Sequence, residues 1–414
     1  MVRVRADWVL PVAGDPIRDG FVEFDEGRIR EVGRYAGGEA VPFGRAVILP
    51  GLVNAHTHLE LSFLRGRIPP AQRFVEWVRP LLAARREGPG PDDPLIVSAA
   101  ESAMRQARST GTALVGEVSN TLVTVPVLRD AGLAARVFYE LIGFSGGDAG
   151  LKVADARARV DGMGEAGEDV RLSLAAHAPY SVSPALFAAI RRDLDAHPGG
   201  LSSVHLGESP EEVELLQEGT GPWRRLLEEL GHWDEAWRPP RCSPVDYLDE
   251  LGFLDGSVLA VHGVQFDGGN LARLRERETT IVSCPRSNRY VGVGRPPLEQ
   301  FYAMNVDVAF GTDSLASVED LNMFAELTEA RRIAPAVSAR RLLRSATLVG
   351  ARALGFGSEF GSLEPGKRAA LVAVRVPEGV TDVEEYLVSG VQPDAVTWLD
   401  EATPNLQLPE SNRR

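Results

Sequence analysis

The sequence predicts an α/β protein built on a (β/α)₈ TIM barrel, with a small β-sandwich formed by the N- and C-terminal segments. Short apolar runs alternate with helical patterns such as 95–110 and 321–333, which indicates parallel strands joined by right-handed crossovers. Eight candidate strands span roughly 260 residues, a usual size for an eightfold barrel. These strands end near His56, Val118, Leu141, His177, Leu206, Gly263, Cys284 and Gly311.

The positions of the histidines favour a barrel over a doubly wound open sheet, which would give the same alternation. The chain has seven histidines, and five of them lie at or just past the predicted strand ends. These five are His56, His58, His177, His205 and His262, and Asp313 follows the eighth strand. Catalytic residues of barrels occupy that face. Scattered core histidines would not line up in this way.

The terminal segments have a different pattern from the middle of the chain. Residues 8–12, 20–24 and 28–32 read as short strands bounded by Gly and Asp. Near the other end, the turn residues 361–367 precede an apolar run at 369–374. We therefore expect 1–48 and 358–414 to form the sandwich and 49–357 to form the barrel.

Composition excludes several classes of function. The 414 residues carry a net charge of −14, which argues against a nucleic-acid surface. No apolar run is long enough to span a bilayer, and the N-terminus lacks the apolar stretch of a signal peptide. Two cysteines do not make a disulfide framework. We expect a cytoplasmic protein that acts on a small molecule; whether it forms a homodimer stays open.

The polar residues at the strand ends are of the types that bind a metal ion. His56 and His58 are two residues apart on an extended segment, so both side chains point to one face. His205 and Asp313 come from other strands. Three imidazoles and one carboxylate suit Zn²⁺ and also accept Fe²⁺. We expect one divalent ion, with a bound water whose pKa falls from about 16 to roughly 7.

Two further residues are placed to act on that water. Glu208 lies three residues after His205, where a general base is needed, and His262 ends the sixth strand, where it could orient the water. Taken singly, each signal has a structural alternative: His205 could be a hydrogen-bonded core histidine and Asp313 a helix N-cap. Their joint occurrence at several strand ends favours the metal site.

These motifs resemble those of the amidohydrolase superfamily, in particular its mononuclear deaminase branch. The resemblance covers nearly the whole chain and rests on 50–58, 177–183, 205–208, 311–314 and 361–367. Two-metal members of that family carry a lysine at the end of the fourth strand, where this chain has His177, so the resemblance implies a single ion. One departure is Ala370, where many relatives carry an aspartate.

A narrower resemblance concerns the substrate. Residues 61–66 and 74–78 look like those of adenosine-type deaminases. The pair of segments 58–62 and 283–288 is similar to aminodeoxyfutalosine deaminases of menaquinone biosynthesis. The resemblance implies hydrolytic deamination of an adenine ring with release of ammonia. Glu208 would move the proton, while His262 and Asp313 hold the attacking hydroxide.

Further residues are candidates for substrate binding. By the same resemblance, His177 would hydrogen-bond the purine, and Glu60 and Ser314 would also contact the substrate. Glu117 is either a solvated charge at the rim or an acceptor for a substrate hydroxyl. Arg286 and Arg65 are candidates to hold a substrate carboxylate, although Arg286 could equally pair with a loop carboxylate.

Two alternatives remain for the function. The same metal site could hydrolyse a triazine-like ring, as a chlorohydrolase or aminohydrolase, or a cyclic amide. The chain could also be a non-catalytic scaffold of the same fold, although scaffold relatives tend to lose ligands and every ligand position here is filled. The role of the long insertion 209–250, which carries three tryptophans, stays open.

Overall fold

The computed structural model describes residues 1–91, 93–145, 147–164 and 169–399. The chain divides into two compact units. One contains Met1–Asn54, Arg105–Leu114 and the chain from Asn322 onward, and the other contains Ala55–Met104 and Val115–Leu321. The expected domain boundaries at 48/49 and 357/358 stay a prediction, and residues 400–414 of the expected sandwich lie outside the described residues.

Two four-stranded sheets lie mainly in the second unit. The first contains β6 (Leu52–Thr57), β7 (Thr112–Ser119), β8 (Ala134–Leu141) and β9 (Val170–Ala176) in that order. The other contains β10 (Ser202–Leu206), β11 (Val258–His262), β12 (Thr280–Ser283) and β13 (Val308–Phe310). All eight strands end within one residue of the predicted positions, so this part of the prediction is confirmed.

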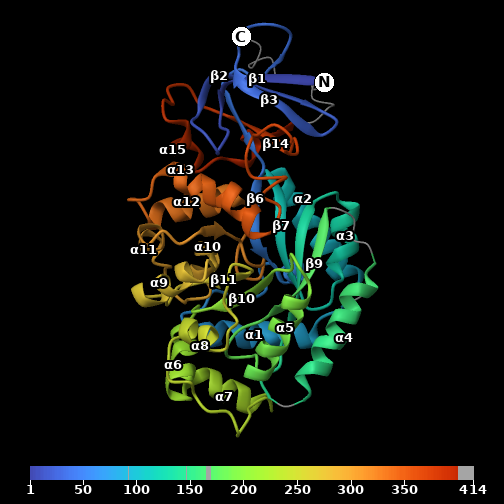
Figure 1. Ribbon diagram of the computed structural model, residues 1–414, viewed down its shortest axis with the longest axis vertical. Helices are drawn as coiled ribbons and strands as arrows, with labels where there is room; N and C mark the ends of the chain where they lie inside the picture. Colours follow the sequence, from blue (N-terminus) through green and yellow to red (C-terminus); the bar gives the residue numbers. More distant parts are fainter. Residues whose placement is uncertain (92, 146, 165–168, 400–414) are drawn as a thin grey trace. The chain divides into compact units, whose positions relative to one another are not determined.

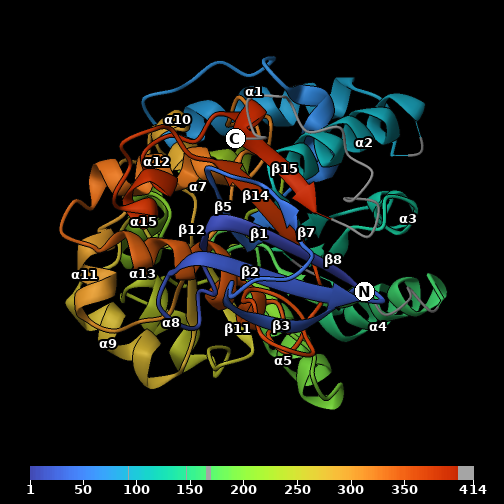
Figure 2. The same cartoon turned by 90° about the horizontal axis from the view of Figure 1, so that it is seen from above.

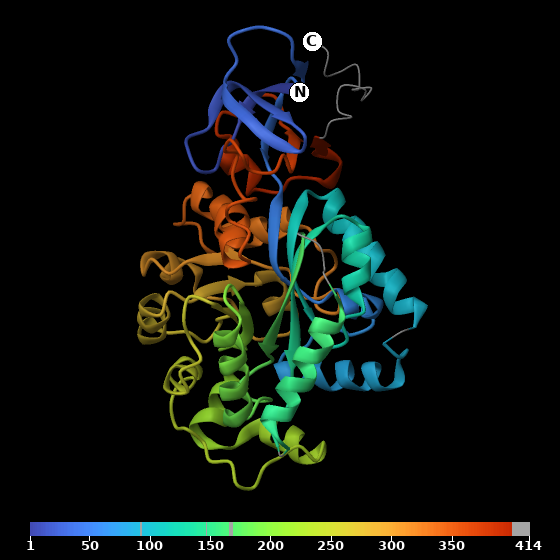
Figure 3. The same cartoon turned by 45° about the vertical axis from the view of Figure 1, so that its right-hand side comes forward.

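These strands form because their side chains are buried on both faces. Every residue of β6, β7, β8 and β10 is buried, as expected for parallel strands covered by helices. The pairs β8–β9, β10–β11, β11–β12 and β12–β13 are parallel. Helices α3 (Thr124–Asp130) and α4 (Ala149–Gly162) pack against β8 and β9, and α5 (Pro184–Ala196) packs against β9 (Figures 1 and 3).

The other helices follow the predicted alternation. Two expected helices, 95–110 and 321–333, correspond to α2 and α12. The bounds are η1 (Leu59–Leu64), α1 (Phe74–Glu87), α2 (Pro94–Ser109), α6 (Pro210–Glu218), α7 (Gly221–Glu229), α8 (Pro244–Glu250), α9 (Gly268–Glu276), α10 (Pro285–Tyr290), α11 (Leu298–Ala303), α12 (Met323–Ile333), α13 (Ala339–Arg344), α14 (Gly350–Ala353) and α15 (Val383–Leu387). Among the described helices, none has the length and apolar character needed to cross a membrane.

Main-chain hydrogen bonds link the two four-stranded sheets at their carboxyl ends. Strand pairing among the described residues does not join them into one closed barrel. His205 N donates to His177 O at 2.9 Å, and the N–H groups of Thr312 and Asp313 donate to His56 O at 3.1 and 3.0 Å. Gly311 permits the second approach, because a Cβ there would lie 2.7 Å from His56 O. The ends of β6, β9, β10 and β13 are thereby brought together.

The first unit contains a seven-stranded sheet that joins the two terminal segments. Its order is β15 (Val396–Leu399), β14 (Leu371–Arg375), β5 (Ala46–Pro50), β1 (Val2–Val9), β2 (Ile17–Asp25) and β3 (Arg28–Arg34), with β4 (Val41–Pro42) paired to β1. Figure 2 shows β1, β2 and β3 side by side. The antiparallel pair β5–β14 joins the N- and C-terminal segments. The pairing defines one sheet, so the expected sandwich is not confirmed.

One predicted strand is misplaced. The sequence favoured a strand at 8–12, but β1 ends at Val9. Pro11 has no N–H to donate to a sheet, and Val12 has a φ of 68°, which no strand residue adopts. The apolar pattern continues past the strand because Leu10 and Val12 are buried.

Candidate active site

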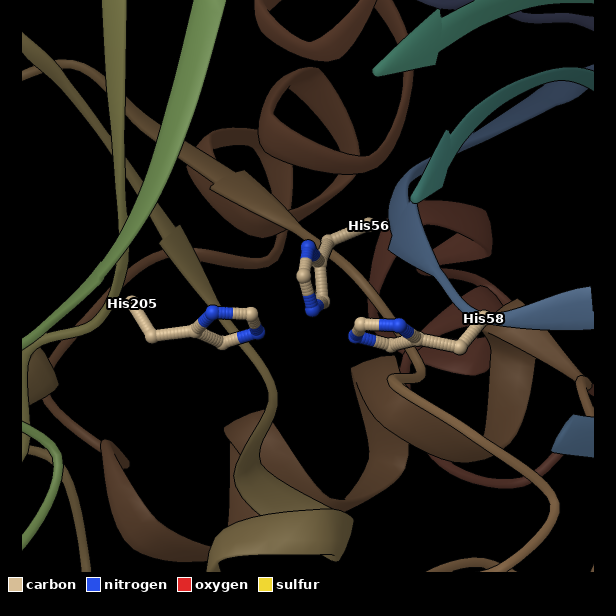
Figure 4. A group of neighbouring side chains, drawn as sticks. All are labelled: His56, His58 and His205. Atoms are coloured by element: carbon tan, nitrogen blue, oxygen red, sulfur yellow. The ribbon is translucent and has the colours of Figure 1, made fainter. Parts of the chain in front are cut away.

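Three imidazoles converge at the carboxyl ends of β6 and β10. Figure 4 shows His56, His58 and His205 pointing toward one another, and one nitrogen from each lies within 4.8 Å of the others. His56 is 1% exposed, and among the described residues neither of its ring nitrogens has a hydrogen-bond partner. Leaving a buried polar atom unpaired costs about 1–3 kcal/mol. A cation between the three rings would remove that penalty.

Asp313 adds a carboxylate to the three imidazoles. Its Oδ1 lies 3.7 Å from His56 Nε2 and 3.5 Å from His58 Nε2, too far for hydrogen bonds. Its Oδ2 accepts hydrogen bonds from Ser287 Oγ at 2.7 Å and Ser317 Oγ at 3.2 Å. Two hydroxyls therefore fix one oxygen while the other faces the histidines. This donor set fits a divalent ion such as Zn²⁺.

Burial keeps these groups in the protonation states that bind metal. Burial lowers the pKa of His56 to about 4 and that of His58 to about 3, so both rings are neutral at pH 7. Burial alone would raise the pKa of Asp313, but the neighbouring imidazoles outweigh it and hold that pKa well below its ordinary value. Neutral imidazoles and an ionised carboxylate are the ligating forms.

Glu208 and His262 face each other beside this cluster. Glu208 Oε1 lies 3.6 Å from His262 Nε2, and both side chains are almost fully buried. Burial, followed by the charge of Asp313, raises the pKa of Glu208 well above its ordinary value. His262 Nδ1 lies 2.8 Å from Asn288 Oδ1, an acceptor, so Nδ1 carries the hydrogen and Nε2 accepts. A carboxyl group that can hold a proton thus sits beside an imidazole acceptor.

Sequence reasoning missed the residue that holds the Glu208 loop. Glu212 is fully buried, and its carboxylate accepts from Gly207 N at 3.0 Å and Glu208 N at 2.9 Å. Gly207 has a φ of 60°, and a Cβ there would lie 2.5 Å from Phe266. A serine three residues before Glu212 was the available signal: Ser209 caps α6 and accepts from Glu212 N.

A second group of residues that could bind a metal ion also includes His205. Donor atoms of Glu140, His177 and His205 are also within 4.8 Å of one another. His205 Nδ1 lies 2.8 Å from His177 O and must donate to that carbonyl, so this nitrogen cannot bind an ion. Glu140 Oε1 lies 3.6 Å from the same nitrogen. No sequence signal singled out Glu140, which follows Phe138 and Tyr139 in a wholly buried strand.

A cavity of about 380 Å³ opens onto the cluster. At the end near the histidine cluster it is lined by His58, His177, His205, Glu208, His262, Asp313 and Ser314. Helix α1 and Tyr180 line another part, and α7 contributes Trp223, Leu226 and Leu227. The rings of Tyr180 and Trp223 stack at 3.8 Å. The insertion 209–250, whose role the sequence left open, therefore supplies a wall of this cavity.

Two predicted substrate-binding acids lie outside this lining. Glu117 is fully buried; its Oε2 accepts from Leu59 N at 2.9 Å and its Oε1 from Thr124 Oγ1 at 3.2 Å. The alternative of a solvated rim charge is therefore wrong. Glu60 accepts from Ser119 Oγ at 2.9 Å and from the backbone N–H of Asn120 at 3.0 Å. Both acids anchor main chain around β7.

The two predicted carboxylate-binding arginines are also absent from the lining. Arg286 Nη1 lies 2.7 Å from Asp320 Oδ1, which is the ion pair considered as the alternative to substrate binding. Arg65 Nε donates to Glu319 O at 3.0 Å. The cationic residues that do line the cavity are Arg85 and Arg86 of α1, which the sequence did not single out.

Comparison with known proteins agrees with this geometry. Residues 47–396 match the amidohydrolase family. An aminodeoxyfutalosine deaminase of Deinococcus radiodurans is 32% identical over 331 residues, 76% of this chain and 75% of that protein. A 5-methylthioadenosine/S-adenosylhomocysteine deaminase of Moorella thermoacetica is 30% identical over 401 residues, 92% and 88% of the two chains. The crystal structure of an adenosine deaminase from Xanthomonas campestris with bound zinc superposes with a TM-score of 0.82 and 28% identity, covering 96% and 90%.

Proposed function

Because this chain belongs to the amidohydrolase family and is a hydrolase acting on carbon–nitrogen bonds, we propose that it deaminates an adenine-containing nucleoside. The substrate proposed is 6-aminodeoxyfutalosine, an intermediate of menaquinone biosynthesis, and the name of the Deinococcus radiodurans relative supports it. The observation that carries the proposal is the buried Glu208–His262 pair beside three convergent histidines at one end of an aromatic cavity.

The proposed metal ligands are His56, His58, His205 and Asp313. A single divalent ion held there, Zn²⁺ or Fe²⁺, would supply a Lewis acid that lowers the pKa of a water molecule to roughly 7. The zinc bound in the Xanthomonas campestris structure supports Zn²⁺. The unpaired ring nitrogens of His56 support an ion at this place.

Glu208 is the proposed proton carrier. Its carboxylate takes a proton from the attacking water and delivers it to the ring nitrogen beside the carbon that bears the amino group. The raised pKa of Glu208, caused first by burial, suits a group that must both accept and release that proton. The water oxygen becomes the ring carbonyl oxygen, its second proton passes to the amino group, and that group leaves as ammonia.

Three residues orient the reactants in this scheme. His262 Nε2, left as an acceptor because Nδ1 donates to Asn288, takes a hydrogen bond from the water. Asp313 Oδ1 faces the same space. The proposed contact of His177 with the purine is supported by its place in the lining, with Nδ1 bonded to Ser181 Oγ and Nε2 left for the substrate.

The proposed barrel draws on the same contacts. We propose that the two four-stranded sheets are halves of one (β/α)₈ barrel. The bonds from His205 N to His177 O and from Asp313 N to His56 O support this, because they join the edge strands at both places where the halves would meet.

A substrate screen tests the proposed function. The metal-loaded protein is assayed for loss of the adenine chromophore and release of ammonia with adenosine, methylthioadenosine, S-adenosylhomocysteine and aminodeoxyfutalosine. A chlorinated triazine is assayed beside them. The highest kcat/KM is expected with aminodeoxyfutalosine. A preference for methylthioadenosine would reassign the substrate within the deaminases, whereas turnover of the triazine alone would overturn deamination.

A further inference from the structure

Helix α1 presents one face to the cavity, and the chemistry of that face changes along the helix. The residues lining the cavity are Phe74, Trp77, Val78, Leu81, Leu82, Arg85 and Arg86. Their spacing of three and four residues places them on a single face. The face is aromatic and apolar until the last turn, where both arginines lie. Eight residues separate Trp77 from Arg85, which is about 12 Å along the helix.

Most N–H groups of the Arg85 guanidinium donate no hydrogen bond among the described residues. Nη2 donates to Asn120 Oδ1 at 3.1 Å, the one hydrogen bond that Arg85 makes among the described residues. Glu60 Oε1 lies 3.9 Å from the same nitrogen, and that acid is already bonded to Asn120 N and two hydroxyls. The Arg85 side chain is 33% exposed. A favourable helix dipole explains an arginine in the last turn, but it does not require one that faces a cavity.

Asn120 fixes the position of Arg85 relative to the candidate metal ligands. Its side-chain Nδ2 donates to Glu140 Oε2 at 2.9 Å, and Glu140 Oε1 lies 3.6 Å from His205 Nδ1. Hydrogen bonds therefore run from Glu140 through Asn120 to the guanidinium, and Glu140 lies beside His205. The end of α1 is thus held at a set distance from the place where the ring would react.

Two tryptophans that line the cavity have indole nitrogens buried in the protein. Trp77 and Trp223 are 6% and 5% exposed, and both line the cavity. Within the part of the chain that the structure describes, the indole Nε1 of each is buried without a hydrogen-bond partner. Buried donors are nearly always paired in folded proteins.

We infer that the cavity takes an adenine nucleoside with a carboxylate on the substituent remote from the ring, and that Arg85 binds this carboxylate. The inference rests on the proposed function and deepens it. The planar guanidinium matches a carboxylate with two parallel hydrogen bonds. The acids that line the cavity, Glu140, Glu208 and Asp313, are associated with the histidines, so an anionic group is attracted to the α1 end.

Matched ligands and variants test this assignment. The ligands are 5′-carboxymethylthio-5′-deoxyadenosine and its uncharged primary amide. KM is measured for both by deamination, and Kd by calorimetry for their hypoxanthine counterparts, which do not react. The wild-type protein should prefer the acid by about 10- to 100-fold. Arg85→Met should abolish the preference for the acid and leave KM and Kd for the amide unchanged. Arg85→Lys should retain part of the preference for the acid.

Arg286→Met is the comparator, since Arg286 is another partly buried arginine near the site and is held in an ion pair with Asp320. It should keep the preference for the acid. Loss of the preference in Arg286→Met, or an equal loss on acid and amide in Arg85→Met, would overturn the inference. A wild-type protein that deaminates acid and amide equally well would also overturn it and leave deamination standing. A wild-type protein that deaminates neither of these, nor any adenine nucleoside of the substrate screen, would instead overturn the proposed function.

Discussion

Two residues of the candidate site have a left-handed backbone. His262, the last residue of β11, has a φ of 76°, and Asp313, three residues after the end of β13, has a φ of 61°. Asp and His tolerate this region better than most residues, although it still costs on the order of 1 kcal/mol. The turn at Asp313 lets its N–H donate to His56 O while Oδ1 faces the histidines. The strained backbone at His262 and Asp313 therefore occurs where side chains from strands distant in the sequence come together.

The first prediction concerns Glu208. Glu208→Gln keeps the size of the side chain and removes the ability to carry a proton. We expect metal content to be unchanged and kcat to fall by about 10²- to 10⁴-fold. Steady-state kinetics together with elemental analysis of the same sample measure both. Near-normal turnover in a metal-replete sample would remove Glu208 from the proposed mechanism.

Asp313→Asn is the matched comparison, because it makes the same chemical change at a proposed ligand. It should lower metal content and activity together, since an amide is a weaker ligand than a carboxylate. If both variants kept their metal and lost activity equally, the separation between ligand and proton carrier would be wrong.

At the scale of elements, α6 and α7 explain the long insertion. Helix α6 begins at Pro210 directly after the Glu208 loop, and Glu212 in its first turn holds the N–H groups of Gly207 and Glu208. Helix α7 then contributes Trp223 to the cavity, and its Glu229 accepts from Arg79 of α1 at 3.0 Å. One insertion therefore both positions the proposed proton carrier and forms a wall of the cavity.

The second prediction concerns the pH dependence of stability at Glu212. Burial raises the pKa of Glu212 to about 7 in the folded protein, against 4.5 for an ordinary glutamate, while backbone N–H donors oppose the shift. Between these values the folded chain binds more protons than the unfolded chain, so its free energy of unfolding falls as pH rises. The contribution of Glu212 should therefore decrease by up to about 3 kcal/mol from pH 4.5 to pH 7 and stay constant above it.

The measurement is the difference in unfolding free energy between the wild-type protein and Glu212→Gln across this pH range. Taking the difference cancels the titration of groups common to both proteins. Glu212→Gln should also lower kcat. The glutamine amide has one acceptor oxygen, whereas the N–H groups of Gly207 and Glu208 each bond to a separate oxygen of Glu212, so the loop that carries Glu208 would lose one of its two hydrogen bonds. A difference in stability that does not vary between pH 4.5 and pH 7 would contradict the assigned pKa.

At the scale of the whole molecule, the site depends on segments that are far apart in the chain. His56, His205 and Asp313 come from β6, β10 and the segment after β13, and main-chain hydrogen bonds bring those strand ends together. An ion that binds all of them would bind the folded state and not the unfolded chain. Its binding free energy then adds to the free energy of unfolding.

The third prediction is the metal content. Elemental analysis should find about one divalent ion per chain, because His205 Nδ1 donates to His177 O and is not available to a second ion. Removal of the ion with a chelator should lower Tm, and Zn²⁺ should restore it. Two tightly bound ions per chain would contradict the single site, and a Tm insensitive to chelation would contradict the coupling to folding.

The sequence by itself determined the eight strand ends and the histidine set that lies on them. Buried parallel strands are read from continuous apolar runs, and the residue after such a run lies at the carboxyl edge whatever the rest of the chain does. The same reasoning extended the strand at 8–12 too far, because the buried Leu10 and Val12 continue the apolar pattern beyond the end of β1. The position of each residue in the chain was therefore enough to predict that His56, His58, His205 and Asp313 lie at the carboxyl ends of strands.

Only the tertiary structure decided which polar side chains meet. Asn288 bonds His262, Glu140 approaches His205 and Arg85 faces the cavity, while Arg286 is paired with Asp320 instead. Each contact joins residues at least 26 positions apart or depends on the face that a helix presents. The pattern of a segment fixes its own faces, but the packing of several elements determines what each face meets. Arg85 and Arg286 are chemically identical in the sequence, and their different surroundings in the fold separate them.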